Sequence, residues 1–427
     1  MRIGNIYFRR FLLVLLVAAT WIPAARGLES HSEAFWFLFP LWVVAGVSIL
    51  RAIPVPRAQH KRPLAKWSVR VVLVLFPLGY CLAMAGFMDA TVAWQEVLIA
   101  IWFFAASLEI LLLYLFQIFD FLRLRLGRGR GRFAEVAALI GTKFVLYSLL
   151  VMFLMPTLSL HRVKFTSRAP PPELGMAFEE VRFPARGEPK ANLAGWFFPL
   201  KDNQGTVLAC HGVGANRADI LEFVWILQKA GFQVLCFDFR GHGQSDGHTV
   251  TYGLREKQDV KGAWDYLMTR HDVDSNSIYG FGLSMGASSL LMSLSELPDM
   301  RAVVVDSAFS SLNHMVRHQY RFVPMPLAEV PIAFTRMIGW LDSGLRVEQV
   351  DAAAAIRGLK VPILFIHGLE DVTIPPECTR ILFDRYDGPK MLRLEPGAAH
   401  GGTAGLNPEQ YRQEVRAFFI GHSSRNR

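Results

Sequence analysis

The stretch that most restricts the fold is residues 277–290, SIYGFGLSMGASSL, in which residues 282–286 have the form G-x-S-x-G. The apolar residues before this motif are typical of a buried strand, and the small residues after it are typical of a helix start. In that strand-turn-helix context the motif presents a serine at the tip of a strand, and its glycines remove side chains that would collide with neighbouring elements. The pattern predicts a nucleophilic Ser284, and a chance match in a glycine-rich turn is the alternative.

Two residues further along the chain can activate such a serine. A serine hydroxyl needs an imidazole to take its proton, and the imidazole needs a carboxylate to fix its tautomer. Asp371 follows the apolar run VPILFIHG (361–368), and His400 follows KMLRLEP (390–396). Both loops lie beyond predicted strand ends, at the sheet edge where Ser284 would be displayed. We therefore predict a triad of Ser284, Asp371 and His400.

The sequence leaves other assignments of the acid and the base open. Glu370 and Asp306 compete with Asp371, although the loop of Asp371 is the one that a histidine after the last strand can meet. A solvent-exposed loop residue is the alternative for His400, and His422 lies in a polar tail.

Two backbone N–H groups are candidates for stabilising a negatively charged oxygen. Met285 would open the helix after the serine, where its N–H points at the developing charge. Val213 lies in the glycine-containing loop after TVLACHG, the position that supplies the second donor in this kind of site. For Asp238, Arg240 and His242 we expect roles in stabilising a turn.

The remaining C-terminal pattern predicts an α/β domain. Segments 179–185 and 191–199 look like an opening antiparallel pair. Apolar strands then alternate with helical segments, which favours a mostly parallel sheet covered by helices on both faces. These segments are strands 232–239, 301–308, 361–368 and 390–396 and helices 219–230 and 255–270.

An apolar insertion at about 309–355 separates two of these strands. It is rich in Met, Phe, Leu and Pro. Such a segment can form a cap over a hydrophobic pocket, rest on a membrane, or be an ordinary helix pair.

The first 160 residues predict a transmembrane region of four or five helices. Hydrophobic residues make up 52% of the chain, more than one soluble globule of this length carries. Most of the apolar stretches approach the ~20 residues needed to span a bilayer. They lie at about 11–25, 34–53, 68–88, 97–121 and 134–158. The first stretch also resembles a signal peptide. Residues 161–172 form a proline-rich linker, and 173–427 form the α/β domain.

Charge predicts the orientation of this region. Residues 1–160 contain 16 Lys and Arg but only 7 Asp and Glu, whereas residues 161–427 contain 29 of each kind. The basic loops 51–70 and 123–132 should face the cytoplasm, which places residues 161–427 on the extracytoplasmic side. The neutral domain carries no surplus of positive charge, so we expect no nucleic-acid partner.

Few other residues suggest a site. Glu109 lies within a predicted span, either as a functional group or as a protonated or helix-paired carboxyl. The four cysteines have no metal-ligand spacing, and we expect no metal and no cofactor.

From about residue 173 to 427 the chain resembles the α/β-hydrolase superfamily, and most closely membrane-linked serine hydrolases of the Bem46/ABHD13-like kind. The motifs that carry this resemblance are EEVRFPA, LAGWFFP, HGVGANR (211–217), DFRGHGQS (238–245), GLSMG (282–286), VDSAFSS (305–311), HGLEDVTIP (367–375) and GAAHGG (397–402). The common relatives have one N-terminal anchor or none, whereas four or five spans are predicted here.

The resemblance implies that Ser284 is the nucleophile, Asp371 the acid and His400 the base, with Val213 and Met285 as oxyanion donors. It implies hydrolysis of carboxylic esters or thioesters through an acyl-enzyme. The lipid bilayer and a hydrophobic acyl-ester substrate are the expected partners, and the oligomeric state is not predicted. A serine peptidase or aminoacyl-amidase and a non-catalytic membrane binding protein are the alternatives.

Overall fold

The computed structural model describes residues 174–423 except 298 and 322, together with 156, 157, 159–161, 164, 169 and 170. The predicted membrane spans lie almost wholly outside these residues, as do the signal-peptide alternative and Glu109. No helix within the described residues is both long and apolar enough to cross a bilayer.

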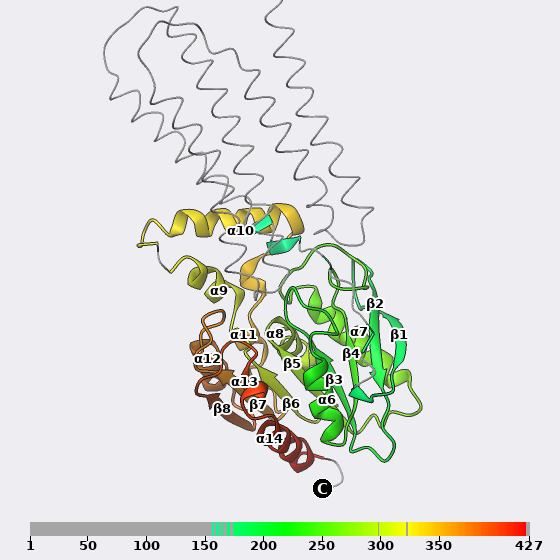
Figure 1. Ribbon diagram of the computed structural model, residues 1–427. Helices are drawn as coiled ribbons and strands as arrows, with labels where there is room; N and C mark the ends of the chain where they lie inside the picture. The colour runs from blue at the N-terminus through cyan, green and yellow to red at the C-terminus, as the bar shows by residue number, and fades with distance from the viewer. Residues whose placement is uncertain are drawn as a thin grey trace, which may run out of the picture. The chain divides into compact units, whose positions relative to one another are not determined.

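Eight strands form one twisted sheet in the order β1-β2-β4-β3-β5-β6-β7-β8 (Figure 1). Strands β3 to β8 run parallel, while β1 and β2 pair antiparallel with each other and β2 pairs antiparallel with β4. The strands are β1 Glu179–Pro184, β2 Asn192–Phe198, β3 Thr206–Cys210, β4 Gln233–Phe237, β5 Ile278–Leu283, β6 Val303–Asp306, β7 Ile363–Gly368 and β8 Lys390–Glu395.

Helices cover both faces of the sheet. The main helices are α6 Leu221–Lys229, α7 Glu256–Thr269, α8 Met285–Leu291, α9 Leu312–Gln319, α10 Glu329–Ser343, α12 Glu377–Arg385 and α14 Pro408–Gly421. Helices α6 and α14 pack their apolar residues into one core, and α7, α8 and α12 pack theirs into the other (Figure 1). The central strands β3 and β4 are buried throughout, as expected of parallel strands covered on both faces. The predicted mostly parallel α/β domain is confirmed.

The insertion between β6 and β7 consists of several short elements. Helices α9 and α10 come first, followed by the 3-10 turn η3 at Val347–Gln349 and helix α11 at Ala352–Ala355. Helix α10 forms one end of the described domain (Figure 1). The chain after β8 continues through helix α13, Thr403–Leu406, into α14.

Candidate active site

Ser284 lies between the end of β5 and the start of α8 with a strained backbone. Its φ of 56° and ψ of −120° fall in a region that residues other than glycine rarely adopt. The surrounding contacts hold the residue in this conformation. Its N–H donates to the carbonyl of Asp306 at 2.9 Å, and its carbonyl accepts from the N–H of Ser288 at 3.1 Å. The side chain is therefore displayed at the carboxyl edge of the parallel strands, as the sequence predicts.

The two glycines of the motif are required by close packing of the backbone. A Cβ on Gly286 would lie 2.4 Å from the carbonyl oxygens of both Cys210 and His211. A Cβ on Gly282 would lie 2.5 Å from the Cα of Ala287. Both distances are far below any van der Waals contact, so only glycine allows β5, β3 and α8 to meet at this turn. The predicted steric reason for these glycines is confirmed.

The structure brings together the three residues predicted to form a triad. Nε2 of His400 lies 3.0 Å from Oγ of Ser284, and Nδ1 of His400 lies 2.6 Å from Oδ2 of Asp371. With the proton on Nδ1 the imidazole donates to the carboxylate and leaves Nε2 to accept from the serine hydroxyl. Ser284 and Asp371 are buried, while the side chain of His400 is 28% exposed, which leaves the base open to solvent and substrate.

Asp371 is held as an anion by several donors. Its Oδ1 accepts from the N–H groups of Thr373 at 2.9 Å and Ile374 at 2.8 Å. Burial alone would raise the pKa of Asp371, but hydrogen bonds from His367 and His400 outweigh it and hold that pKa well below its usual value. The carboxylate is therefore charged at neutral pH and able to stabilise an imidazolium on His400.

His367 is a contact of Asp371 that the sequence reasoning missed. Its ring is fully buried, with Nε2 at 3.2 Å from Oδ2 of Asp371 and 2.9 Å from the carbonyl of Ile374. Its Nδ1 lies 2.6 Å from Oγ1 of Thr379 on α12. With its proton on Nε2, His367 donates to the carbonyl of Ile374 and to the carboxylate of Asp371, while Nδ1 accepts from the hydroxyl of Thr379. The only signal for it in the sequence is a histidine four residues before the acid, at the end of a strand.

The competing acids lie elsewhere. Glu370 is exposed on the same loop. Asp306 is buried and bound by the hydroxyls of Ser307, Thr403 and Tyr411. Burial raises the pKa of Asp306, partly offset by these hydrogen bonds. Asp306 thus ties β6 to the segment after His400, and the carboxylate in contact with the imidazole is that of Asp371.

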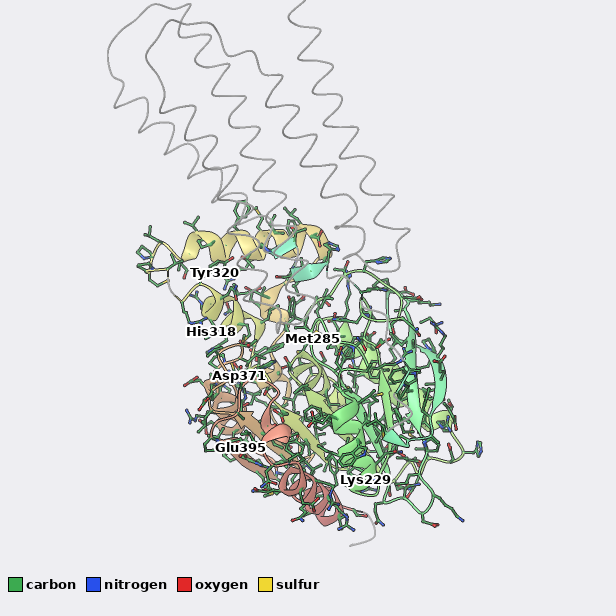
Figure 2. The ribbon with its side chains drawn as sticks, viewed as in Figure 1. Lys229, Met285, His318, Tyr320, Asp371 and Glu395 are labelled. Atoms are coloured by element: carbon green, nitrogen blue, oxygen red, sulfur yellow. The ribbon has the colours of Figure 1, made fainter. Side chains whose placement is uncertain are left out.

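The two predicted oxyanion donors belong to segments that adjoin Ser284. Met285 is the first residue of α8, and the loop after β3 passes close to the serine, since a Cβ built on Gly212 would lie 3.2 Å from the Cβ of Ser284. Neither the N–H of Val213 nor that of Met285 donates to an acceptor within the described part of the chain. Figure 2 labels Met285 and Asp371 together with His318 of α9.

Polar contacts stabilise the loop that contains Val213. The N–H of Gly214 donates to Nε2 of His242 at 3.1 Å, and the N–H of Phe239 donates to Nε2 of His211 at 3.0 Å. A buried ion pair joins Arg217 to Asp238 at 2.7 Å, and a second joins Arg240 to Asp259 at 2.6 Å. The structural roles predicted for Asp238, Arg240 and His242 are confirmed.

Comparison with known proteins identifies relatives of this chain. Over 252 residues the chain is 30% identical to the protein YqkD of Bacillus subtilis, a match that covers 57% of this chain and 81% of YqkD. It is 27% identical over 219 residues to the α/β-hydrolase domain-containing protein WAV2 of Arabidopsis thaliana, covering 50% of this chain and 68% of WAV2. A family model described as serine aminopeptidase, S33, matches residues 201–354.

The chain belongs to the α/β-hydrolase superfamily. A solved structure of the Pyrococcus furiosus esterase Pf2001 resembles this α/β-hydrolase domain with a TM-score of 0.51 and 24% identity, covering 62% of this chain and 97% of the esterase. That likeness concerns the fold. Among the described residues there is no cluster of three or more His, Cys, Asp or Glu side chains able to hold a metal ion.

Proposed function

We propose that this chain is a membrane-bound serine hydrolase that cleaves carboxylic ester or thioester bonds through an acyl-enzyme. The observation that carries the proposal is the hydrogen-bonded series from Ser284 Oγ to His400 Nε2 and from His400 Nδ1 to Asp371, at 3.0 Å and 2.6 Å. This arrangement matches the geometry by which a serine becomes a nucleophile.

In the proposed reaction Oγ of Ser284 attacks the acyl carbon while Nε2 of His400 takes the hydroxyl proton. The carboxylate of Asp371 stabilises the imidazolium, and the N–H groups of Val213 and Met285 bind the tetrahedral oxyanion. His400 then protonates the departing alcohol or thiol, leaving an ester on Ser284. A water molecule, deprotonated by His400, hydrolyses that ester and restores the serine.

Fluorophosphonate labelling of the full chain tests this proposal. We expect the wild-type protein to be labelled and the Ser284→Ala variant to be unreactive. Ser289→Ala is the matched control because Ser289 lies on α8, which begins directly after Ser284, and its buried hydroxyl has no hydrogen-bond partner among the described residues. Equal labelling of wild type and Ser284→Ala, or of neither, contradicts the proposed nucleophile.

Membrane attachment and sidedness are part of the proposal. The apolar N-terminal segments and their basic loops support a multi-pass anchor with the hydrolase domain on the extracytoplasmic side. We also propose that the chain is similar to the Bem46/ABHD13-like enzymes in particular. We further propose a lipid-like acyl substrate, which the apolar insertion that contains α9 and α10 supports. Equal turnover of short soluble and long-chain esters would contradict this substrate preference.

A second candidate is an aminopeptidase or aminoacyl-amidase. It is supported by the description of the family model that matches residues 201–354, serine aminopeptidase. Both reactions use the same nucleophile and base, so labelling cannot separate them. Purified protein should hydrolyse acyl thioesters or nitrophenyl esters faster than aminoacyl nitroanilides if the esterase proposal holds, and the reverse order favours the peptidase.

A further inference from the structure

Helix α10 carries apolar side chains on its outward face. Val330 is 59% exposed, Met337 42%, Trp340 53% and Leu341 63%. Their spacing of seven, three and one residues places them on one side of an α-helix, and Ala333 on the same side is also exposed. A surface helix in water normally presents charged and polar residues there.

The opposite face of α10 is also apolar and packs into the domain. Ile332 and Ile338 are buried in the core, together with Gly339. Because the inner face already holds the helix on the domain, the outer side chains are not needed for that packing. A contiguous exposed apolar surface of this kind marks a contact with a membrane or another molecule.

The chain itself indicates which contact this is. Nε2 of His161 lies 2.7 Å from Oδ2 of Asp342, in the last turn of α10. The carbonyl of Leu160 accepts from the N–H of Val250 at 2.8 Å, and that of Ser159 accepts from the hydroxyl of Tyr252 at 3.0 Å. The segment that enters the domain is thus bound beside the end of α10 (Figure 1).

The last predicted membrane span ends at about residue 158. Three residues of backbone extend at most about 10 Å, and the side chain of His161 then contacts Asp342, so the end of α10 lies near the point where the chain would leave the bilayer. A helix of 15 residues is about 22 Å long, too short to cross a hydrocarbon core but long enough to lie flat on its surface.

We infer that α10 lies in the plane of the bilayer surface, with Val330, Met337, Trp340 and Leu341 inserted at the boundary between headgroups and acyl chains. The inference rests on the proposed membrane attachment. It adds a lipid-binding surface on the hydrolase domain that the transmembrane prediction does not contain. Trp340 suits this position because an indole presents an apolar body and a polar N–H at the interface.

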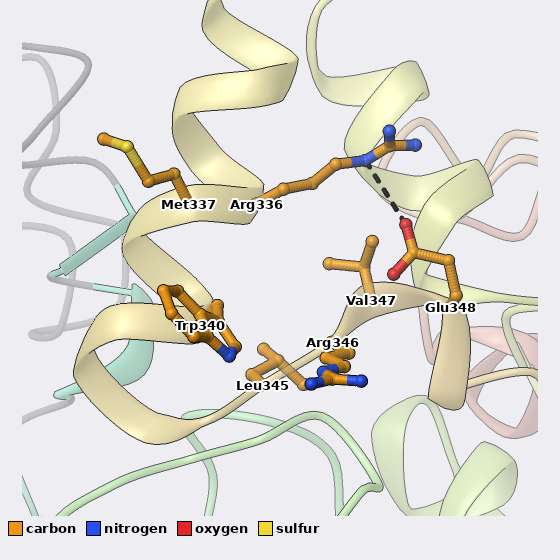
Figure 3. Close-up of a pocket in the computed structure, with 7 residues that line it drawn as sticks. All are labelled: Arg336, Met337, Trp340, Leu345, Arg346, Val347 and Glu348. Carbon is orange, nitrogen blue, oxygen red and sulfur yellow. Dashed lines mark ion pairs between the residues drawn. The ribbon is translucent and has the colours of Figure 1, made fainter.

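A hollow of about 420 Å³ beside this face is lined by both apolar and charged side chains. Met337, Trp340, Leu345 and Val347 supply its apolar wall, and Arg336, Arg346 and Glu348 supply charge (Figure 3). Nε of Arg336 lies 3.7 Å from Glu348, whereas Arg346 forms no ion pair with any described residue. Apolar side chains next to an available guanidinium fit acyl chains beneath phosphate headgroups.

The same insertion reaches the candidate active site. The hydroxyl of Tyr320, after α9, lies 2.8 Å from Oγ1 of Thr335 on α10. Nε2 of His318 on α9 lies 3.3 Å from the carbonyl of Val372, next to Asp371. With α10 on the bilayer, the side of the domain that carries the triad would therefore face the membrane surface, from which an acyl lipid would leave the bilayer.

Spin labels on the full chain test the placement of α10. Val330→Cys, Met337→Cys and Leu341→Cys would each be made with Cys81→Ser, labelled with a nitroxide, and reconstituted in phosphatidylcholine and phosphatidylglycerol vesicles. Cys210, Cys236 and Cys378 are fully buried, and burial raises the pKa of each thiol, so they should not react. Met391→Cys on β8 is the matched control, because Met391 is 56% exposed on a different element.

We expect nitroxides on α10 to collide more with oxygen and less with a water-soluble nickel chelate than the label at 391 does. Nickel accessibility equal to that at 391 shows a water-exposed face and overturns the inference. Low accessibility to both reagents shows that protein covers the face, either a second copy or another segment of this chain, and also overturns it. Failure of the full chain to float with vesicles overturns the membrane attachment as well, and fluorophosphonate reactivity reports the chemistry separately.

Discussion

At the scale of single residues, the candidate site depends on how firmly Asp371 is held. One carboxylate oxygen, Oδ2, faces both His400 at 2.6 Å and His367 at 3.2 Å, while the other accepts two backbone N–H groups. An imidazole that must take a proton from Ser284 needs its partner fixed to within a fraction of an ångström. His367 is therefore a positioning residue for the acid and does not itself reach the serine.

Replacing His367 should slow catalysis without weakening substrate binding. We expect His367→Ala to lower kcat by about 10- to 100-fold with little change in KM, because a small displacement of Asp371 misaligns the base. Gln places a donor near the position of Nε2, so His367→Gln should recover part of the rate. Steady-state ester hydrolysis measures both constants. A rise in KM with unchanged kcat, or no difference between the Ala and Gln variants, would contradict a positioning role.

At the scale of elements, buried histidines connect β3 to the turn after β4. Burial lowers the pKa of His211 to about 4, because the charged ring has no water around it and Nε2 must accept from Phe239. The unfolded chain binds a proton at an ordinary histidine pKa of about 6.5. The stability contributed by neutral His211 is complete above that pH and is lost as pH falls from 6.5 toward 4.

This linkage predicts a pH-dependent unfolding free energy. Between pH 7 and pH 5 the contribution of His211 should fall by about 2 kcal/mol. Urea unfolding of the full chain in detergent, followed by tryptophan fluorescence, measures the change. His211→Asn should remove that part of the slope, and His248→Asn, at an exposed position, should keep it. Equal slopes for all three proteins would show that His211 does not titrate as inferred.

Most elements of the domain follow from local patterns in the chain. Segments 219–230 and 255–270 become α6 and α7 with ends shifted by one or two residues. The G-x-S-x-G motif predicts the turn at Ser284 from its own five residues, although the carbonyls that a Cβ on Gly286 would meet belong to the distant Cys210 and His211. The contact of His367 with Asp371 depends on how distant elements pack. The residue spacing in α10 predicts an apolar side, but only the packing of Ile332 and Ile338 shows that this side faces outward.

The choice of Asp371 over Asp306 likewise depends partly on the local sequence and partly on the packing of distant elements. Asp306 is the last residue of β6 and Asp371 follows β7, so both carboxylates lie at the ends of buried parallel strands and their local sequences are equally suitable. What separates them is the sheet order, which places the loops after β7 and β8 side by side and leaves Asp306 to bind Thr403 and Tyr411. A sequence pattern can place both acids at the correct edge, but the neighbours of each strand decide which one meets His400.

At the scale of the whole molecule, the distribution of charge predicts on which side of the membrane Ser284 works. The surplus of positive charge lies entirely in residues 1–160, mainly in loops 51–70 and 123–132. Because such loops are usually retained in the cytoplasm, the five predicted spans, or four after signal cleavage, would leave the hydrolase domain on the opposite side. The proposed bilayer contact of α10 would then involve the outer surface of the membrane.

A membrane-impermeant fluorophosphonate should therefore label Ser284 in sealed right-side-out vesicles and not in sealed inverted ones. The physical reason is access, since the charged reagent cannot cross the hydrocarbon core. Detergent should make both preparations equally reactive, and Ser284→Ala should abolish the signal in each. Labelling confined to inverted vesicles would place the domain in the cytoplasm and contradict the orientation, while leaving the assignment of the nucleophile intact.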